Sequence, residues 1–229
     1  NSIFFEIFFK ALSSKKFKSP IVLIASLKII QLQMKKLNIK RRINLINFNK
    51  FNQYHLNNKN VNLINVDYSQ SKPFEKISSK SNLYIEKCFD VALNMIKKKI
   101  TNKFINGPIS KKFFLKKKFL GITEYLANKT NSKSFAMLIY NKKLSVCPLT
   151  THLPLKKVSK KISRKIIIEK VKLINNFFIK DLKKRPNIAI TGLNPHCESI
   201  DSFNEDEKIL KPAIKSLSKS KVRVSGPHA

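Results

Sequence analysis

Glycine is scarce in this chain of 229 residues, with only four, at positions 107, 121, 192 and 226. The common dinucleotide- and phosphate-binding loops need several closely spaced glycines, because their backbone approaches the phosphates directly. The sequence contains neither G-x-G-x-x-G nor G-x-x-x-x-G-K-[ST], so an ordinary Rossmann enzyme is disfavoured. It also lacks G-x-S-x-G and H-E-x-x-H segments, the usual signs of a serine hydrolase or a zinc protease.

Cysteine and long apolar runs are also sparse. Cys88, Cys147 and Cys197 lie far apart without C-x-x-C spacing, which indicates neither a zinc knuckle nor a disulfide framework. Free thiols fit a reducing compartment, so we expect a cytoplasmic protein. The apolar segment 3–12 is interrupted by charged residues and the segment 21–25 is too short to cross a bilayer, so we expect no membrane partner.

Acidic residues are few, 13 Asp and Glu against 47 Lys and Arg, which gives a formal net charge of +34. Such a field attracts polyanions, and a non-enzymatic polyanion-binding protein is one hypothesis. However, the basic residues are almost all lysine and are spread from end to end. Lysine, asparagine, isoleucine and phenylalanine share adenine- and thymine-rich codons, so genome composition explains the bias. No basic stripe is interleaved with stacking aromatics, and we therefore expect no nucleic-acid partner.

What is present indicates an α/β protein. With 42% hydrophobic residues the chain can bury a core, and apolar runs alternate with longer segments of helical period. The predicted strands are residues 21–25, 43–46, 62–66, 103–106, 135–140, 144–147, 187–191 and 222–224. The clearest predicted helix is 162–182, and a second begins near Asn204 and is kinked or restarted at Pro212. We expect the loop 70–73 to separate two sub-regions.

Two of the four histidines follow predicted strands. His152 comes just after strand 144–147, and His196 comes just after strand 187–191. Open α/β sheets build their sites at the carboxyl ends of strands, and two neutral imidazoles that meet there can bind a divalent metal. Taken singly, either histidine is more often an ordinary loop residue.

The other candidate ligands are weaker. Cys197 adjoins His196 and is a possible third ligand, although a small buried thiol is its simpler interpretation. His55 lies in an asparagine-rich stretch, and His228 lies next to the last residue. Neither has a comparable setting.

Five short segments follow one another along the chain: N-G-P-I-S-K at 106–111, G-I-T-E-Y-L-A at 121–127, T-T-H-L-P-L at 150–155, L-N-P-H at 193–196 and S-G-P at 225–227. In order and spacing they resemble the signature segments of the 4-hydroxythreonine-4-phosphate dehydrogenase family, and residues 1–12 resemble its first helix. Because the chain starts at Asn1 and stops at Ala229, we expect a piece of such an enzyme that lacks both ends.

The resemblance implies specific site residues. His152 and His196 match the histidines that ligate a divalent metal in this family, which would be zinc, magnesium or cobalt. Thr123 matches a substrate-binding threonine, Ile122 occupies the position of the family's substrate histidine, and Lys111 matches a lysine of another signature segment. The family's third metal histidine, further substrate residues and much of the cofactor site belong to a C-terminal part beyond residue 229.

The resemblance also implies a fold and an activity. The fold would be the two-lobed α/β architecture of isocitrate and isopropylmalate dehydrogenases, incomplete over residues 1–229, with the active site in a cleft at the interface of a homodimer. The activity would be oxidation of 4-phosphooxy-L-threonine by NAD (or NADP) in pyridoxal phosphate biosynthesis. Ile122 keeps open a related dehydrogenase of threonate or erythronate phosphate. We expect the chain on its own to be inactive.

Overall fold

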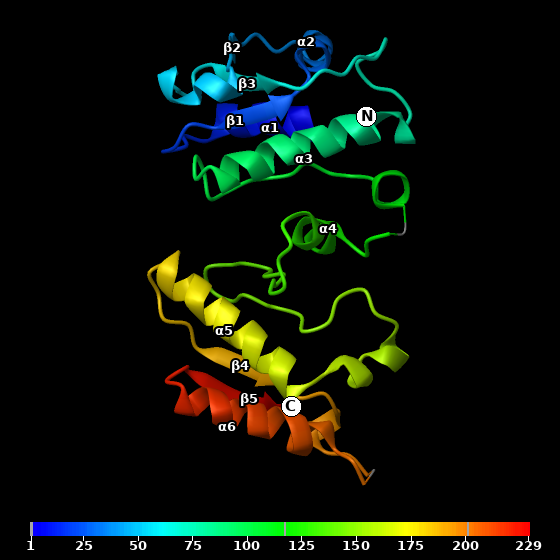
Figure 1. Cartoon of the computed structure of the whole chain (residues 1–229), viewed down its shortest axis with the longest axis vertical. Coiled ribbons are helices and arrows are strands. Elements are labelled where there is room, and N and C mark those ends of the chain that lie inside the picture. The colour runs from blue at the N-terminus through cyan, green and yellow to red at the C-terminus, as the bar shows by residue number, and fades with distance from the viewer. Residues whose placement is uncertain (1, 117, 201) are drawn as a thin grey trace. The chain divides into compact units, whose positions relative to one another are not determined.

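Parallel strands and the helices that cover them organise both units of the chain (Figure 1). The computed structural model describes residues 2–116, 118–200 and 202–229. The chain divides into two compact units, Asn1–Lys118 and Phe119–Ala229. The α/β class predicted from the sequence is therefore confirmed.

The first unit is built on a three-stranded parallel sheet. Strand β3 (Val61–Asn65) lies between β1 (Val22–Ala25) and β2 (Ile43–Leu45). Four of the five residues of β3 are buried, as is typical of a central parallel strand covered on both faces. Asn62 within it satisfies its amide by donating to the carbonyl oxygens of Ile21 and Asn57, at 3.1 and 2.8 Å.

Helices pack on both faces of this sheet. On one face α1 (Phe4–Ser14) and α2 (Leu27–Lys36) form a core with β1 and β3, whose buried members are Phe5, Phe9, Leu23, Ala25, Ile29, Ile30, Met34, Val61 and Leu63. On the other face α3 (Asn82–Lys97) contributes Met95 to a cluster with Ile46 and Ile64. Short helical turns complete this unit at Phe48–Gln53, Ser79–Ser81 and Lys111–Leu115.

The second unit has a parallel pair, β4 (Ile188–Thr191) and β5 (Val224–His228), covered by α5 (Arg164–Lys180) and α6 (Lys211–Lys219). Its buried core consists of Ile167, Val171, Leu210, Ala213, Leu217 and Val222. The unit begins with α4 (Ile122–Lys129), and its short helical turns are Leu155–Lys157, Ser159–Lys161, Pro195–Cys197 and Asp206–Leu210.

Most predicted elements are confirmed. The helix expected at 162–182 is α5, which starts after the capping residue Ser163. The helix expected near Asn204 is a wide turn, Asp206–Leu210, that continues into α6, where Pro212 stands in the first turn, the one place where a helix tolerates its missing N–H. The last strand lies further on than expected, at Val224–His228.

Three predicted strands are wrong. Residues 103–106 form a loop that pairs with none of the described strands, with Phe104 packed on Phe89 and Ile105 85% exposed. Residues 135–140 and 144–147 share only one antiparallel bridge, Ile139 with Val146. Both bridge residues are more than half exposed, so apolar sequence without a surface to pack on has not made a strand.

The expected boundary between sub-regions is also wrong. The chain divides between Lys118 and Phe119 rather than at the loop 70–73. The reason is that α3, which follows this loop, packs Met95 against the sheet of the first unit. The loop itself is held to α2, because Gln33 donates to the carbonyl oxygen of Pro73 at 2.8 Å.

Candidate functional site

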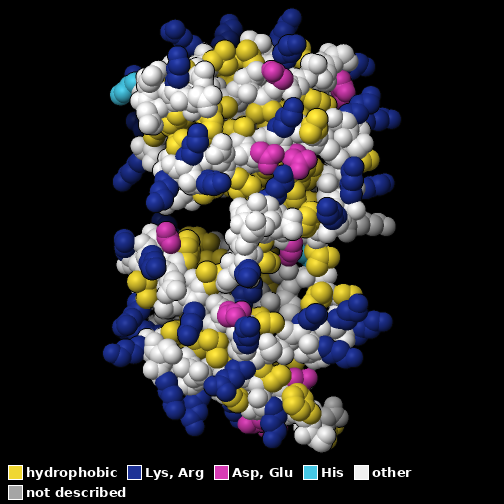
Figure 2. Space-filling model, in the orientation of Figure 1, with side chains coloured by type: hydrophobic (Ala, Val, Ile, Leu, Met, Phe, Trp, Pro, Cys, Tyr) yellow, Lys and Arg dark blue, Asp and Glu magenta, His cyan; other side chains and the backbone are white. Residues whose placement is uncertain are grey.

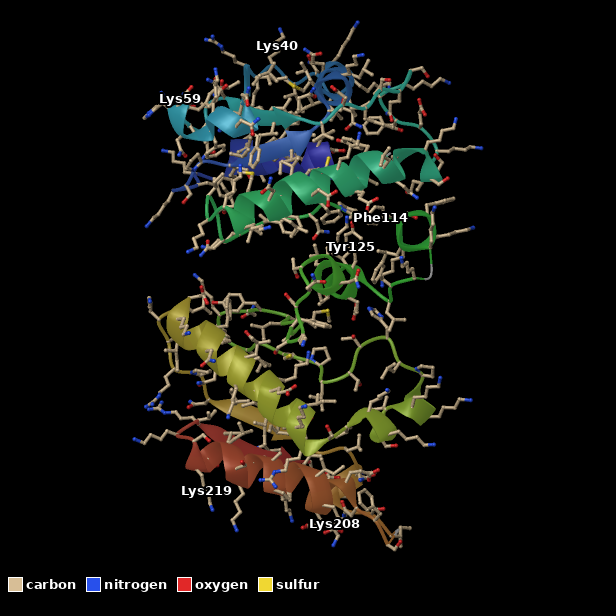
Figure 3. All side chains as sticks on the ribbon, in the orientation of Figure 1. Lys40, Lys59, Phe114, Tyr125, Lys208 and Lys219 are labelled. Carbon is tan, nitrogen blue, oxygen red and sulfur yellow. The ribbon has the colours of Figure 1, made fainter. Side chains whose placement is uncertain are left out.

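A carboxylate joins two of the segments that carry candidate site residues. Glu124 lies in the first turn of α4, and its Oε1 accepts a hydrogen bond of 2.9 Å from the hydroxyl of Thr151, 27 residues further along the chain. Helix α4 is fixed by Tyr125, labelled in Figure 3, which is 6% exposed and packs edge-on against Phe119 with ring centroids 5.5 Å apart. The loop that contains His152 is thus tied to an anchored helix.

His152 itself lies close to the start of α4. A Cβ atom added to Gly121 would lie 2.9 Å from Glu124 Oε2 and 3.4 Å from His152 Nε2. Both polar side chains therefore pass over the bare Cα of Gly121, and a larger residue would displace them. The side chain of His152 is exposed, and its backbone has φ of 57°, a left-handed conformation that is uncommon for a residue with a Cβ.

The expected setting of His152 needs correction. It does not follow a strand, because residues 144–147 are not one, and it lies in an irregular loop before the short turn Leu155–Lys157. The loop takes its place from the bond between Thr151 and Glu124 instead. The sequence analysis did not identify Glu124 as a site residue. The one feature that could have indicated it is its place in the first turn of a helix, next to the expected substrate residue Thr123.

His196 does follow a strand, as predicted, just beyond the end of β4. Its loop is held by Asp206, which is completely buried. The carboxylate of Asp206 accepts hydrogen bonds from the backbone N–H groups of Leu193 and Asn194, at 2.9 and 3.0 Å, and from the side-chain amide of Asn194 at 3.0 Å. A buried carboxylate with three donors is well compensated, so the loop is firmly fixed.

The residues around Gly192 complete this loop. A Cβ at Gly192 would lie only 2.6 Å from Cys197 Sγ and 3.2 Å from Asp206 Oδ1. Cys197 is half-buried and packs on Gly192, in agreement with its simpler interpretation as a packed thiol. His196, with φ of 54°, is exposed, while His228 is engaged with the hydroxyl of Ser225 at 2.8 Å.

The donors present fit part of a metal site. Exposed imidazoles on fixed loops are suitable ligands for zinc or cobalt, and His152 and His196 meet that description. Within residues 2–116, 118–200 and 202–229, however, no three His, Cys, Asp or Glu side chains are grouped so as to hold an ion. Catalytic zinc sites normally use three protein ligands. The convergence of the two histidines on one ion remains a prediction.

The predicted substrate-binding residues fall in both units. Ile122 and Thr123 open α4 and are half-buried, next to the Glu124 bond described above. Lys111 is exposed and begins the turn Lys111–Leu115 of the first unit, which Ser110 caps through the backbone N–H of Phe113. No residue of the chain was assigned to cofactor binding from the sequence.

In the part of the chain that the structure describes, the distribution of charged and apolar side chains indicates no further binding surface near these loops. Figure 2 shows lysine and arginine side chains scattered over the visible face of each unit, without one continuous stripe. This pattern favours a compositional origin for the net charge of +34. Among the described helices, none is long and apolar enough to cross a membrane.

Comparisons with known proteins point to the same family as the five segments. The family model described as "Pyridoxal phosphate biosynthetic protein PdxA" matches residues 16–229. A 4-hydroxythreonine-4-phosphate dehydrogenase of Sulfurihydrogenibium is 34% identical over 171 residues, which are 73% of this chain and 52% of that protein. A D-threonate 4-phosphate dehydrogenase of Pectobacterium atrosepticum is 32% identical over 47% of this chain and 33% of its own length.

A solved structure has the same fold. The 4-hydroxythreonine-4-phosphate dehydrogenase of Klebsiella pneumoniae superposes with a TM-score of 0.83 at 23% identity, over 99% of this chain and 71% of that one. The chain spans about half the length of the curated relative from Sulfurihydrogenibium. Since the family model covers nearly all of its residues, the chain belongs to the PdxA family of pyridoxal phosphate biosynthetic proteins.

Proposed function

We propose that the protein to which this chain belongs oxidises 4-phosphooxy-L-threonine with NAD (or NADP). The product, 2-amino-3-oxo-4-phosphooxybutanoate, loses carbon dioxide to give 3-amino-2-oxopropyl phosphate. The hydroxyl-bearing carbon gives a hydride to the nicotinamide while its oxygen releases a proton, so the oxidation balances. The observation that carries the proposal is the family match over residues 16–229 together with two fixed loops that each present a histidine.

In this proposal His152 and His196 would hold a divalent ion, with a third donor from outside the described residues. The ion would be zinc, magnesium or cobalt, and it would act as a Lewis acid at the substrate oxygen. Thr123 would bind the substrate through its hydroxyl at the start of α4, with Lys111 as a further contact to a negative group. The protein's own part is to place these groups, and the nicotinamide carries the hydride.

The architecture and assembly follow from the same resemblance. We infer a two-lobed dehydrogenase fold of the isocitrate dehydrogenase type and a homodimer in the cytoplasm. The exposed apolar residues around the bridge of Ile139 and Val146 support a second copy as partner, because Ile139, Leu144 and Val146 are 59%, 74% and 53% exposed. In sedimentation experiments, the Leu144→Lys variant should dimerise more weakly than the Lys143→Leu variant. Equal dimer affinities of the two variants would contradict the inference.

A second substrate is favoured by one residue. Ile122 stands where the family has a substrate histidine, and isoleucine cannot donate to a phosphate or carboxylate. The relative from Pectobacterium atrosepticum carries the name D-threonate 4-phosphate dehydrogenase. A threonate or erythronate phosphate is therefore the alternative substrate, with the same hydride transfer.

The test is an assay of NADH formation by absorbance. The 229-residue chain and the longer protein are purified and given zinc, magnesium or cobalt, with NAD or NADP and each phosphate in turn. We expect turnover of 4-phosphooxy-L-threonine by the longer protein and none by the chain alone, whose two histidines hold metal weakly. Faster turnover of D-threonate 4-phosphate would establish the alternative, and no turnover of either compound would contradict the proposal.

A further inference from the structure

We propose that Glu124 and Thr151 are positioning residues that hold His152 in place for metal binding. The inference rests on the proposed function, because it takes His152 as a ligand. Its geometric basis is independent of that role: Thr151 donates to Glu124 Oε1 at 2.9 Å, and Glu124 Oε2 lies with His152 Nε2 beside Gly121.

The loop of His152 needs such a support. His152 has φ of 57°, and a residue with a Cβ in that conformation is stable only when its surroundings fix it. The loop belongs to no sheet, and of the residues that follow His152, Leu153 is half-buried while Pro154 and Leu155 are exposed. The hydroxyl of Thr151, adjacent to His152, therefore supplies a specific anchor from the helix side.

The anchor itself is rigid. Glu124 comes from the first turn of α4, where a negative side chain is favoured by the helix dipole. One residue further, Tyr125 is buried against Phe119, so the helix cannot slide easily under the loop. A ligand held from a packed helix loses little conformational entropy when the ion binds, which raises the affinity for metal.

The two oxygens of Glu124 have different parts. Oε1 fixes the loop by accepting from Thr151, while Oε2 and His152 Nε2 both lie beside Gly121. Groups outside the ligands that hold a metal-binding histidine in place matter for affinity, and their loss typically costs about 10- to 100-fold in metal binding. Because Ile122 and Thr123 belong to the same turn, the bond also links the expected substrate contacts to the metal loop.

The experiment measures Co²⁺ binding to the longer protein by isothermal titration calorimetry. Thr151→Val removes only the hydroxyl, and Glu124→Ala removes the carboxylate. Both should weaken Co²⁺ binding by roughly ten-fold or more. Glu124→Gln keeps an oxygen that accepts from Thr151 and should retain most of the affinity. Thr150→Val, the same change one residue earlier, is the matched control and should bind Co²⁺ like the unaltered protein.

Two readouts separate failure of this inference from failure of the proposed function. His152→Ala is titrated alongside: unchanged affinity in that variant would overturn the role of His152 itself. Loss of affinity in His152→Ala but not in Thr151→Val would overturn the positioning role alone. Without metal, the thermal unfolding midpoint of Thr151→Val should lie within a few degrees of that of Thr150→Val. A much lower midpoint for Thr151→Val would mean that Thr151 stabilises the fold rather than positions His152.

Discussion

The backbone N–H of Asn194 donates a hydrogen bond of 3.0 Å to the carboxylate of Asp206, twelve residues later. The same arrangement recurs at Thr151 and Glu124, where the hydroxyl donates at 2.9 Å. In both cases an acidic residue at the start of a helical segment holds the loop that presents a candidate metal ligand. Two separate loops of the second unit are thus each held by a hydrogen bond to a carboxylate.

Asp206→Ala should destabilise the second unit. It leaves the N–H groups of Leu193 and Asn194 without their acceptor in a buried setting, at a cost of about 3 kcal/mol in the free energy of unfolding. The measurement is urea denaturation followed by circular dichroism. Glu207→Ala is the control, because Glu207 is exposed and forms only a surface pair with Lys211, so its loss should cost less than about 1 kcal/mol. Equal effects of the two changes would contradict this account of Asp206.

Gly192→Ala should also destabilise the loop, by about 1 to 3 kcal/mol, since its Cβ would lie 2.6 Å from Cys197 Sγ. Cys197→Ala removes that sulfur, so the double variant should recover much of the loss. Only part is recoverable, because Asp206 Oδ1 stays 3.2 Å from the new Cβ. Denaturation of both single variants and the double variant gives the coupling free energy. Additive effects would show that Cys197 does not pack on Gly192.

Stability of the first unit should fall in alkaline solution. Burial raises the pKa of Cys88 from 9.0 to about 11, although a hydrogen bond with Tyr84 works against the shift. Burial, and after it the charge of Cys88, raises the pKa of Tyr84 from its ordinary 10.0. A raised pKa stabilises the fold below the unfolded pKa, and this stability is lost as the pH rises through the folded value. The free energy of unfolding should therefore decline from about pH 9 to 11.

The variant Cys88→Ala tests the origin of that decline. It should reduce the fall by on the order of 2 kcal/mol, because one of the two groups that resist ionisation is gone. Cys147→Ala is the matched control, since Cys147 belongs to the second unit and its loss should leave the decline of the first unit unchanged. A decline of unchanged size in Cys88→Ala would show that Cys88 does not cause it.

Ile122→His should improve catalysis by the longer protein on 4-phosphooxy-L-threonine. A histidine at the start of α4 can donate to an anionic group of the substrate, and one added charge-assisted hydrogen bond is worth roughly ten-fold in kcat/KM. Leu126→His, one turn further along the same helix, should give no gain. Unchanged or slower kinetics in Ile122→His would mean that this position has taken another role.

Periodicity identified the elements that pack on a broad apolar surface. The helix α5 was predicted from an apolar stripe, and the structure buries Ile167 and Val171 from that stripe. The same reasoning failed for residues 144–147, because Leu144 is 74% exposed and has no neighbouring strand to complete a sheet. Apolar composition alone does not say whether a partner surface exists.

The sequence predicted the candidate metal ligands but not the residues that hold their loops. Motif order pointed to His152 and His196, but not to the carboxylates that hold their loops. Glu124 and Thr151 are 27 residues apart, so no local pattern reveals their hydrogen bond. The sequence predicted a helix that begins near Asn204, but no pattern indicated that the buried carboxylate of Asp206 accepts hydrogen bonds from the backbone of the loop before His196.

The claim that His152 and His196 act on one ion is tested most directly by a double-mutant cycle on Co²⁺ affinity. The longer protein is titrated calorimetrically as the unaltered protein, as His152→Ala, as His196→Ala and as the double variant. If both imidazoles bind the same ion, either single change removes most of the affinity, and the double variant binds only slightly more weakly than each single variant. If the two losses multiply, or if either single variant binds Co²⁺ like the unaltered protein, the histidines do not share a metal.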